Sequence, residues 1–122
     1  IEERGVFFMD NCIFCKIIKG EIPARKVYED EYCTAFYDIN PQMPVHIVVA
    51  AKRHVPDVLG FTAEDAKFLG GIQLAIAEIA RKLNLAENGF RVINNCGKDA
   101  KQSVPHLHYH ILAGGDMGER IV

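Results

Sequence analysis

The sequence predicts an α+β domain in which a five-stranded antiparallel sheet packs with one long and one short helix. The chain has 122 residues, 49% apolar and 25% charged, which describes one compact unit large enough to bury a core. Its strand-sized apolar segments are short, and a single long segment has helical periodicity. Because the two kinds of segment do not alternate regularly, a parallel βαβ sheet is not expected.

The short elements are marked by their residue patterns and by the turns between them. Residues 12–19 carry apolar side chains four positions apart, which is typical of a short amphipathic helix, and Gly20 and Pro23 end it. Segments rich in β-branched and aromatic residues, bounded by polar or Gly- and Pro-containing turns, indicate strands. The expected strands are residues 26–29, 33–38, 46–51, 90–94 and 106–113.

The long helix is expected at about residues 63–83. Thr62 is a suitable N-cap, and Asp65 occupies the capping-box position three residues later. Apolar side chains recur at intervals of three and four residues, which places them in one stripe on the helix surface. The stripe consists of Phe68, Leu69, Ile72, Ala75, Ile76, Ile79 and Leu83.

Composition and charge exclude several function classes. A net charge of −2 gives no basic surface for nucleic acid and no polybasic patch for a membrane. The longest apolar run, residues 47–51, is far shorter than the ~20 residues of a membrane span. Residues 1–8 lack the pattern of a signal peptide and precede Met9, so we expect an upstream extension or cloning remnant, followed by a single domain at 9–122. These observations predict a cytoplasmic protein.

The four cysteines are not expected to form a disulfide framework in a chain without a leader. Cys33 and Cys96 stand among apolar neighbours and are expected to be small buried hydrophobes. Cys12 and Cys15 form a Cys-x-x-Cys pair. A redox role needs a βαβ context that the chain lacks, and a tetrahedral zinc site needs two further ligands. Two reduced thiols on a helix face are the simplest interpretation of the pair alone.

Three histidines, His106, His108 and His110, alternate with other residues in one predicted strand. Alternate side chains of a strand point to the same face, so the three imidazoles are expected to form a row. Repulsion between protonated rings keeps at least one of them neutral near pH 7. A neutral imidazole is a competent nucleophile, and a protonated neighbour can bind an oxyanion or assist a leaving group. A purely structural row and an in-line zinc or copper site are the alternatives.

This run and its flanks resemble the histidine triad (HIT) superfamily, whose signature is His-φ-His-φ-His-φ-φ with φ apolar. The chain looks closest to the branch of nucleotide-binding purine nucleoside phosphoramidases. The resemblance extends from residue 12 to residue 115. The matching segments are Ile-Phe-Cys-Lys-Ile-Ile (13–18), Glu-Ile-Pro-Ala (21–24), Phe-Tyr-Asp-Ile-Asn-Pro-Gln (36–42), Pro-Val-His-Ile (44–47), Lys-Arg-His (52–54) and Gln-Ser-Val-Pro-His (102–106).

The resemblance implies catalytic roles at matching positions. His108 would attack the α-phosphorus of a nucleoside 5′-phosphoramidate or acyl-nucleotide, giving a nucleotidyl-histidine that water then hydrolyses. His110 would hold phosphate oxygens, and His46 would orient the nucleophile through hydrogen bonds. His106 would support the row from its outer end. Ser103 matches a residue that assists the leaving group, and no cofactor is implied for catalysis. Considered alone, His46 would be a satisfied core histidine and Ser103 an ordinary loop residue.

The resemblance also implies a purine nucleotide site. Asp38 fits a bidentate grip on the ribose hydroxyls, although an Asp before a Pro-containing loop also commonly caps the following turn. Asn95 matches a residue that contacts the phosphate and the leaving group, and its alternative is an ordinary loop role. The base would occupy an apolar slot formed by Ile13, Phe14, Ile17, Phe36 and Ile39.

Some members of the superfamily that carry the Cys-x-x-Cys pair complete a structural Cys2His2 zinc site with two histidines. The resemblance gives His54 of Lys-x-His and the first triad histidine, His106, as the partners of Cys12 and Cys15. Structural zinc and two reduced thiols are both open at this point.

The chain departs from the family pattern at three places. Lys101 stands where the family usually has glycine, and a side chain there would change the phosphate loop or add a cation to it. Pro105 replaces an aromatic or aliphatic residue before the triad. The chain contains no tryptophan, so the Trp-containing tail of many branch members is missing. Because that tail shapes leaving-group preference, substrate selectivity is the property that the resemblance predicts least well.

The resemblance further implies a homodimer in which two five-stranded sheets join into one ten-stranded sheet. Two other functions stay open beside the phosphoramidase. One is a nucleotide-binding regulator or adaptor whose catalysis is incidental, and the other is a dinucleoside polyphosphate hydrolase. A nucleotidyl transferase is disfavoured, because that branch has glutamine at the third triad position, where this chain has His110.

Overall fold

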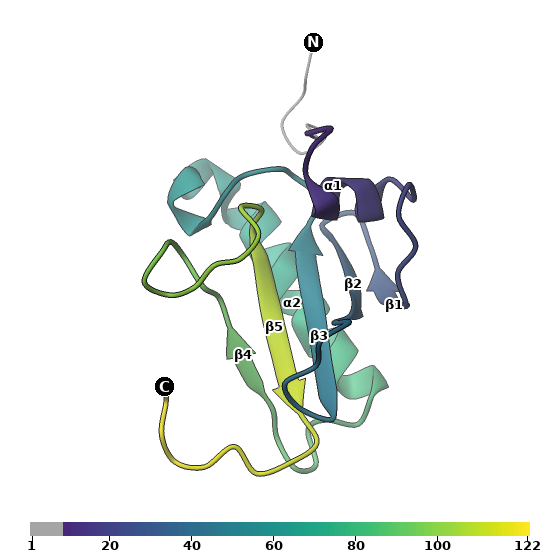
Figure 1. Cartoon of the computed structure of the whole chain (residues 1–122), viewed down its shortest axis with the longest axis vertical. Helices are drawn as coiled ribbons and strands as arrows, with labels where there is room; N and C mark the ends of the chain where they lie inside the picture. Colours follow the sequence, from purple (N-terminus) through teal and green to yellow (C-terminus); the bar gives the residue numbers. More distant parts are fainter. Residues whose placement is uncertain (1–8) are drawn as a thin grey trace.

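The protein has the predicted α+β fold in a computed structural model that describes residues 9–122. The predicted extension at residues 1–8 lies outside the described residues. One sheet contains the strands in the order β1-β2-β3-β5-β4, with neighbours antiparallel (Figure 1). The strands are β1 Lys26–Glu29, β2 Cys33–Tyr37, β3 Val45–Ala51, β4 Arg91–Ile93 and β5 His108–Ala113; the helices are α1 Ile13–Ile18 and α2 Ala66–Lys82, with 3-10 turns η1 Val58–Gly60 and η2 Ala63–Asp65.

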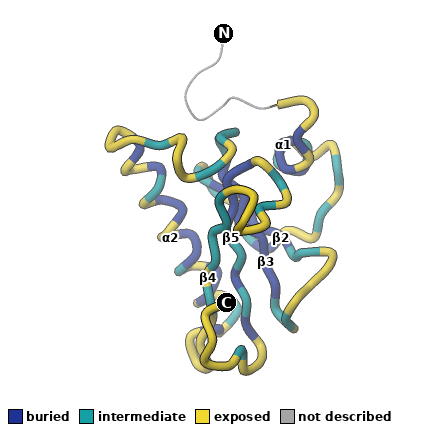
Figure 2. Tube along the Cα trace, turned by 60° about the vertical axis from the view of Figure 1, so that its left-hand side comes forward, coloured by how far each residue is buried: buried dark blue, intermediate teal, exposed yellow. Residues whose placement is uncertain are grey.

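The two faces of the sheet are covered by different helices. The long helix α2 lies along one face, and the short helix α1 lies against the other face near one end of the strands (Figures 1 and 2). Side chains alternate between these faces along β3: Ile47 and Val49 belong to the core under α2, whereas Val48 and Ala50 pack in a smaller cluster with α1. The histidine-bearing strand β5 pairs with β3, so the same alternation sorts its residues.

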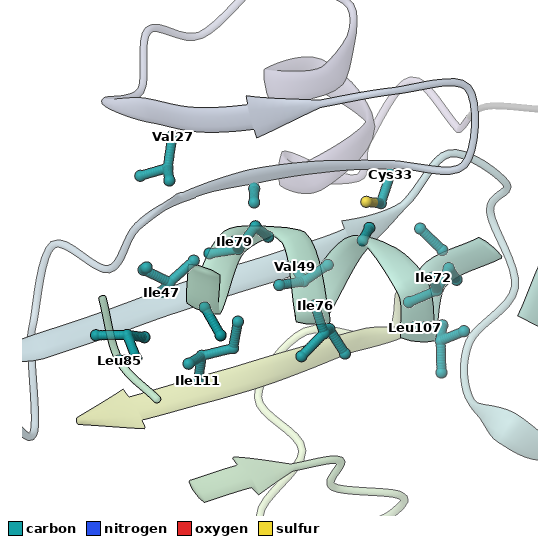
Figure 3. Packing of buried hydrophobic residues seen from close by; sticks show 14 of the residues in the cluster. Val27, Cys33, Ile47, Val49, Ile72, Ile76, Ile79, Leu85, Leu107 and Ile111 are labelled. Atoms are coloured by element: carbon teal, nitrogen blue, oxygen red, sulfur yellow. The ribbon is translucent and has the colours of Figure 1, made fainter. Parts of the chain in front are cut away.

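The larger core lies between α2 and the sheet (Figure 3). Most of the predicted helical stripe is buried there, while Leu69 and Leu83 are only partly buried. Thr62 and Asp65 form the predicted capping box, but they cap the 3-10 turn η2. The α-helix proper therefore starts at Ala66, three residues later than expected.

Other predicted boundaries need small corrections. Strand β5 begins at His108, not at residue 106, because the preceding amides bond outside the sheet: His106 N–H donates to Val104 O (2.8 Å) and Leu107 N–H to Val55 O (2.7 Å). The remaining elements match or differ by about one residue at an end. Cys33 is fully buried as predicted, whereas Cys96 is only partly buried.

Among residues 9–122, no helix is long and apolar enough to cross a membrane. All four cysteines are free thiols, as predicted. The cytoplasmic location stays a prediction.

Candidate active site

The histidines gather on the face of the sheet that α1 covers. The rings of His108 and His110 lie 5.1 Å apart between centroids, and His46 of β3 lies 5.0 Å from His110. Phe14 of α1 stands edge-on to His108 at 4.9 Å and to His106 at 5.8 Å. The intervening residues Leu107 and Ile111 are buried in the core under α2, and Tyr109 packs against it. The strand therefore separates a polar face from an apolar face, as its alternation predicts.

The protonation of His108 follows from its backbone partner. Its Nδ1 lies 2.6 Å from the carbonyl oxygen of His106, which can only accept a hydrogen bond, so Nδ1 carries the proton and donates it. In the neutral ring, the lone pair is then on Nε2. Burial lowers the pKa of His108, which is 3% exposed, and this favours the neutral form. His108 thus holds a nucleophilic nitrogen in a fixed orientation.

A second chain of hydrogen bonds fixes the opposite tautomer in His110. The backbone N–H of Gln42 donates to His46 Nδ1 (3.0 Å), so the proton of the neutral His46 ring is on Nε2. That Nε2 lies 2.9 Å from His110 Nδ1, which therefore accepts, and the proton of His110 is on its own Nε2. Burial, together with the neighbouring His108 and His46, lowers the pKa of His110 to about 4. The row thus contains a neutral N–H donor at His110, in addition to the neutral nucleophile expected from the spacing.

Two cavities adjoin these rings. The first, here called the apolar cavity, has a volume of about 560 Å³, and all five predicted base-slot residues line it together with Asp38, Ser103, His108 and His110. Ile39 stands at its rim with 92% of its surface exposed. The second, here called the polar cavity, measures about 550 Å³ and is lined by Asp38, Asn40, Gln42, His46, Ile93, Asn95, Lys101, Ser103, His110 and Leu112. Asp38, Ser103 and His110 line both cavities and so mark their common boundary.

The Cys-x-x-Cys pair lies beside His54 and His106, the two histidines expected from the resemblance. Cys12 Sγ lies 3.3 Å from His106 Nδ1, Cys15 Sγ lies 3.3 Å from His54 Nδ1, and the two Nδ1 atoms are 3.2 Å apart. His106 Nε2 is 2.7 Å from the carbonyl of Ala51 and donates to it, which leaves the Nδ1 lone pair facing the sulfurs. Tetrahedral zinc holds such ligand atoms about 3.3–3.8 Å apart, so this donor set fits zinc.

The two thiols of this cluster are buried. Burial raises the pKa of Cys15 to about 11, and the nearby Cys12 adds to this effect. A bound divalent cation would reverse this balance, because it stabilises the thiolate. Asp38, His46 and His110 also come close enough to hold an ion, but the hydrogen bonds of His46 already account for that arrangement.

Comparison with known proteins agrees with this arrangement of histidines. The model of the HIT domain family matches residues 19–117. The chain belongs to the HIT family. It is 46% identical over 112 residues to an uncharacterised 13.2 kDa HIT-like protein of Azospirillum brasilense, covering 91% of this chain and 92% of that protein.

Solved HIT-family structures share the whole fold. A histidine triad protein from Clostridium difficile superposes with a TM-score of 0.89 at 45% identity, covering 93% of this chain and 99% of its own. A HIT family hydrolase from Clostridium thermocellum superposes with a TM-score of 0.90 at 46% identity, covering 94% of this chain and 100% of its own. The predicted membership of the superfamily is thereby confirmed, and so is the predicted architecture within one chain.

Within this HIT domain, Asp38 caps the turn that follows it and also lines both cavities. Its Oδ1 accepts the backbone N–H of Asn40 at 2.7 Å, which is the turn cap, and its Oδ2 lies 3.5 Å from His46 Nε2. The carboxylate still faces both cavities. Capping and ribose binding are therefore compatible, since each carboxylate oxygen accepts more than one hydrogen bond.

Several residues near the candidate site of this HIT domain have contacts that the sequence did not predict. Asn94 donates from Nδ2 to the carbonyl oxygen of His108 (2.9 Å), whereas its predicted neighbour Asn95 lines the polar cavity. Gln42 fixes the tautomers through its backbone amide, a role that no residue type reveals. Arg25, also at the apolar cavity, lies 4.6 Å above the Tyr37 ring; a lone arginine after a predicted helix gave no indication of this.

Proposed function

We propose that this HIT-family protein is a nucleotide-binding hydrolase that cleaves the P–N or acyl-phosphate bond of purine nucleoside 5′-phosphoramidates and related acyl-nucleotides. One observation carries the proposal. His108 has a lone pair on Nε2 and His110 has an N–H on Nε2, and both residues line a cavity suited to a nucleoside. The Clostridium thermocellum relative described as a HIT family hydrolase supports the reaction class.

The nucleoside would enter the apolar cavity. A purine ring is flat and largely apolar, which suits the apolar cavity whose wall includes Phe14 of α1 and Phe36 of β2. Asp38 would accept hydrogen bonds from the ribose hydroxyls. The α-phosphate would then reach the boundary between the cavities, where His110 donates from Nε2 and the Ser103 hydroxyl lies on the leaving-group side.

The first step forms a bond between His108 Nε2 and phosphorus while the P–N bond to the amine breaks. The electron pair of that bond leaves with the amine nitrogen, which takes a proton that the Ser103 hydroxyl relays from solvent; the attacking water of the second step returns one proton to solvent. The nucleotidyl-histidine ring is positively charged, so its Nδ1–H donates more strongly to the His106 carbonyl oxygen. His106 supports the nucleophile through this backbone oxygen.

Water completes the reaction. Its oxygen attacks phosphorus, the P–Nε2 bond breaks, and the lone pair returns to His108. The net products are the free amine and the nucleoside monophosphate, with the elements of one water added across the original bond. No metal participates in these steps.

The nucleophile is tested by His108→Ala. Turnover of adenosine 5′-phosphoramidate is expected to fall by at least about 10³-fold, because no other lone pair replaces Nε2 at the boundary. Binding of AMP, measured by calorimetry, should persist. Tyr109→Phe is the matched control, since its side chain lies on the opposite face of β5 and its activity should stay near wild type. Retained turnover in the His108 variant would contradict the assignment, and tight AMP binding without wild-type turnover would favour the regulator.

We further propose that Cys12, Cys15, His54 and His106 hold a structural zinc ion. When bound, zinc would tie α1 to the segment before β5 and supply no chemistry to the reaction. Elemental analysis should find about one zinc per chain in the wild type and in Cys96→Ser, and much less in Cys15→Ser. Chelation should lower the melting temperature of the first two proteins only. A wild-type protein free of zinc after purification in zinc-supplemented medium would favour the reduced thiols.

A further inference from the structure

Lys101 adopts a backbone conformation that favours glycine. Its φ of +61° lies in the left-handed region, where a side chain costs energy that glycine does not incur. The turn is closed on itself: Lys101 N–H donates to Lys98 O (3.0 Å) and Gln102 N–H to Gly97 O (3.1 Å). The lysine is therefore held in this conformation by its surroundings.

Gln102 fastens this turn to the rest of the domain. Its Nε2 donates to Pro56 O (2.6 Å) and Val104 O (3.0 Å), while its Oε1 accepts from Gly97 N–H (3.0 Å). All the hydrogen-bonding atoms of this side-chain amide are thus used to fix the turn. The anchored turn places Lys101 in the wall of the polar cavity, beside Asn95, Ser103 and His110.

Lys101 brings a positive charge to the wall of the polar cavity. Within the described chain, Lys101 forms no ion pair, whereas its neighbour Lys98 lies 3.6 Å from the carboxylate of Asp99. The carboxylate of Asp38 also lines the cavity; its Oδ2 lies 3.5 Å from His46 Nε2, and no ion pair within residues 9–122 joins it to Lys101. No other lysine or arginine among residues 9–122 lines this cavity.

The geometry of attack directs the leaving group into the same cavity. His108 lines the apolar cavity and is not part of the polar one. In an in-line displacement, the leaving group departs on the side opposite the nucleophile. With phosphorus at the boundary formed by Ser103 and His110, that direction leads away from His108 and toward Lys101.

We propose that Lys101 makes the polar cavity a leaving-group subsite that selects substrates whose leaving group carries an anion, a carboxylate or a further phosphate. This inference rests on the proposed function for the position of the phosphate. It assigns Lys101 to substrate selection, because the ammonium group attracts the far end of the leaving group and takes no part in bond cleavage.

The kinetic test compares two substrates that differ only in that charge. They are the adenosine 5′-phosphoramidates of β-alanine, which ends in a carboxylate, and of β-alaninamide, which is neutral. The ratio of their kcat/KM values should fall by about tenfold in Lys101→Gln relative to wild type, and less at high salt, where the charge interaction is screened. Lys98→Gln removes a charge from the same turn outside the cavity and should leave the ratio unchanged. An unchanged ratio in Lys101→Gln, or an equal fall in Lys98→Gln, would overturn the proposal.

Lys101→Gly separates the loss of the ammonium group from damage to the turn. Glycine adopts φ +61° without strain, so this variant should be at least as stable as wild type and still lose the preference for the carboxylate. A Lys101→Gly protein that keeps the wild-type ratio would count against the ammonium group.

A binding measurement separates this inference from the hydrolase proposal. The α,β-methylene analogue of ADP cannot be cleaved and carries an anionic phosphate where the leaving group would lie. Its affinity relative to AMP should drop by about tenfold in Lys101→Gln, as measured by calorimetry, whether or not the protein turns over phosphoramidates. Absence of turnover by the wild type with this drop present would reject the hydrolase alone. An unchanged relative affinity would reject the subsite.

Discussion

His108 and His110 are two residues apart on one strand, yet they present opposite groups to the site. One ring offers a lone pair and the other a proton, because the His106 carbonyl oxygen fixes the first and the chain from Gln42 N–H through His46 fixes the second. The spacing in the sequence predicted that the rings share a face, and the resemblance suggested their roles. Their tautomers could not be predicted, since they depend on backbone groups that residue types do not reveal.

The lowered pKa of His110 makes the stability of the protein depend on pH. Its pKa in the folded state is about 4, below the ordinary value of 6.5. Between these two pH values the His110 ring is protonated in the unfolded chain and neutral in the folded chain. The free energy of unfolding should therefore decline as the pH falls from about 6.5 to about 4. Urea titrations across this range should show that His110→Asn takes up about one proton fewer on unfolding, whereas Tyr109→Phe matches wild type. Identical slopes for all three proteins would show that His110 titrates normally.

At the scale of elements, α2 approaches the sheet at a glycine. Gly71 is buried, and a Cβ at this position would collide with the ring of Tyr32. The apolar stripe of α2 and the capping box of η2 could be predicted from the sequence because both depend on local spacing. The need for glycine at residue 71 was not, because Tyr32 is far away in the sequence.

Two adjacent alanine substitutions test this close packing. Gly71→Ala should destabilise the protein by about 1–3 kcal/mol, since the Tyr32 ring or the helix must move. Gly70→Ala should instead stabilise it by about 0.5–1 kcal/mol, because Gly70 is exposed, has open space at its Cβ, and alanine favours the helix. Denaturant unfolding of both variants measures the contrast. Equal effects at the two positions would show that Tyr32 adapts freely.

Viewed as a whole, the molecule has a sheet with two edges and apolar side chains that its own fold leaves uncovered. The short strand β4 forms one edge, where Val92 is partly exposed, and Leu74 on α2 is 70% exposed. An exposed strand edge presents unpaired N–H and C=O groups that can pair with a strand of another chain. We keep the homodimer with a joined ten-stranded sheet as a prediction.

Sedimentation can decide this assembly. Wild type should sediment as a dimer, and Leu74→Glu should shift it toward a monomer, because the change places a charge in the predicted contact. Leu59→Glu is the matched control: Leu59 is as exposed as Leu74 but lies on η1, so its variant should stay dimeric. A monomeric wild type, or dissociation of both variants alike, would argue against this interface.

The overall architecture was more predictable than its details. Five strands and two helices followed from periodicity and turn residues, which are local properties. The grouping of Cys12 and Cys15 with His54 and His106, which lie far away in the sequence, was available only through resemblance. The later start of β5 was missed because the Leu107 N–H donates to the carbonyl oxygen of Val55, a pairing that only the folded chain creates.

The pairing of β3 with β5 sets His110 opposite Val48 and Ile111 opposite Ile47. A slip of β5 by a single residue would turn its imidazoles toward α2 and place aliphatic side chains on the face that lines the apolar cavity. A chain with this register would lose its hydrophobic core and the arrangement of histidines in the candidate site together. Selection for a stable molecule and selection for a working one therefore act on the same strand alignment.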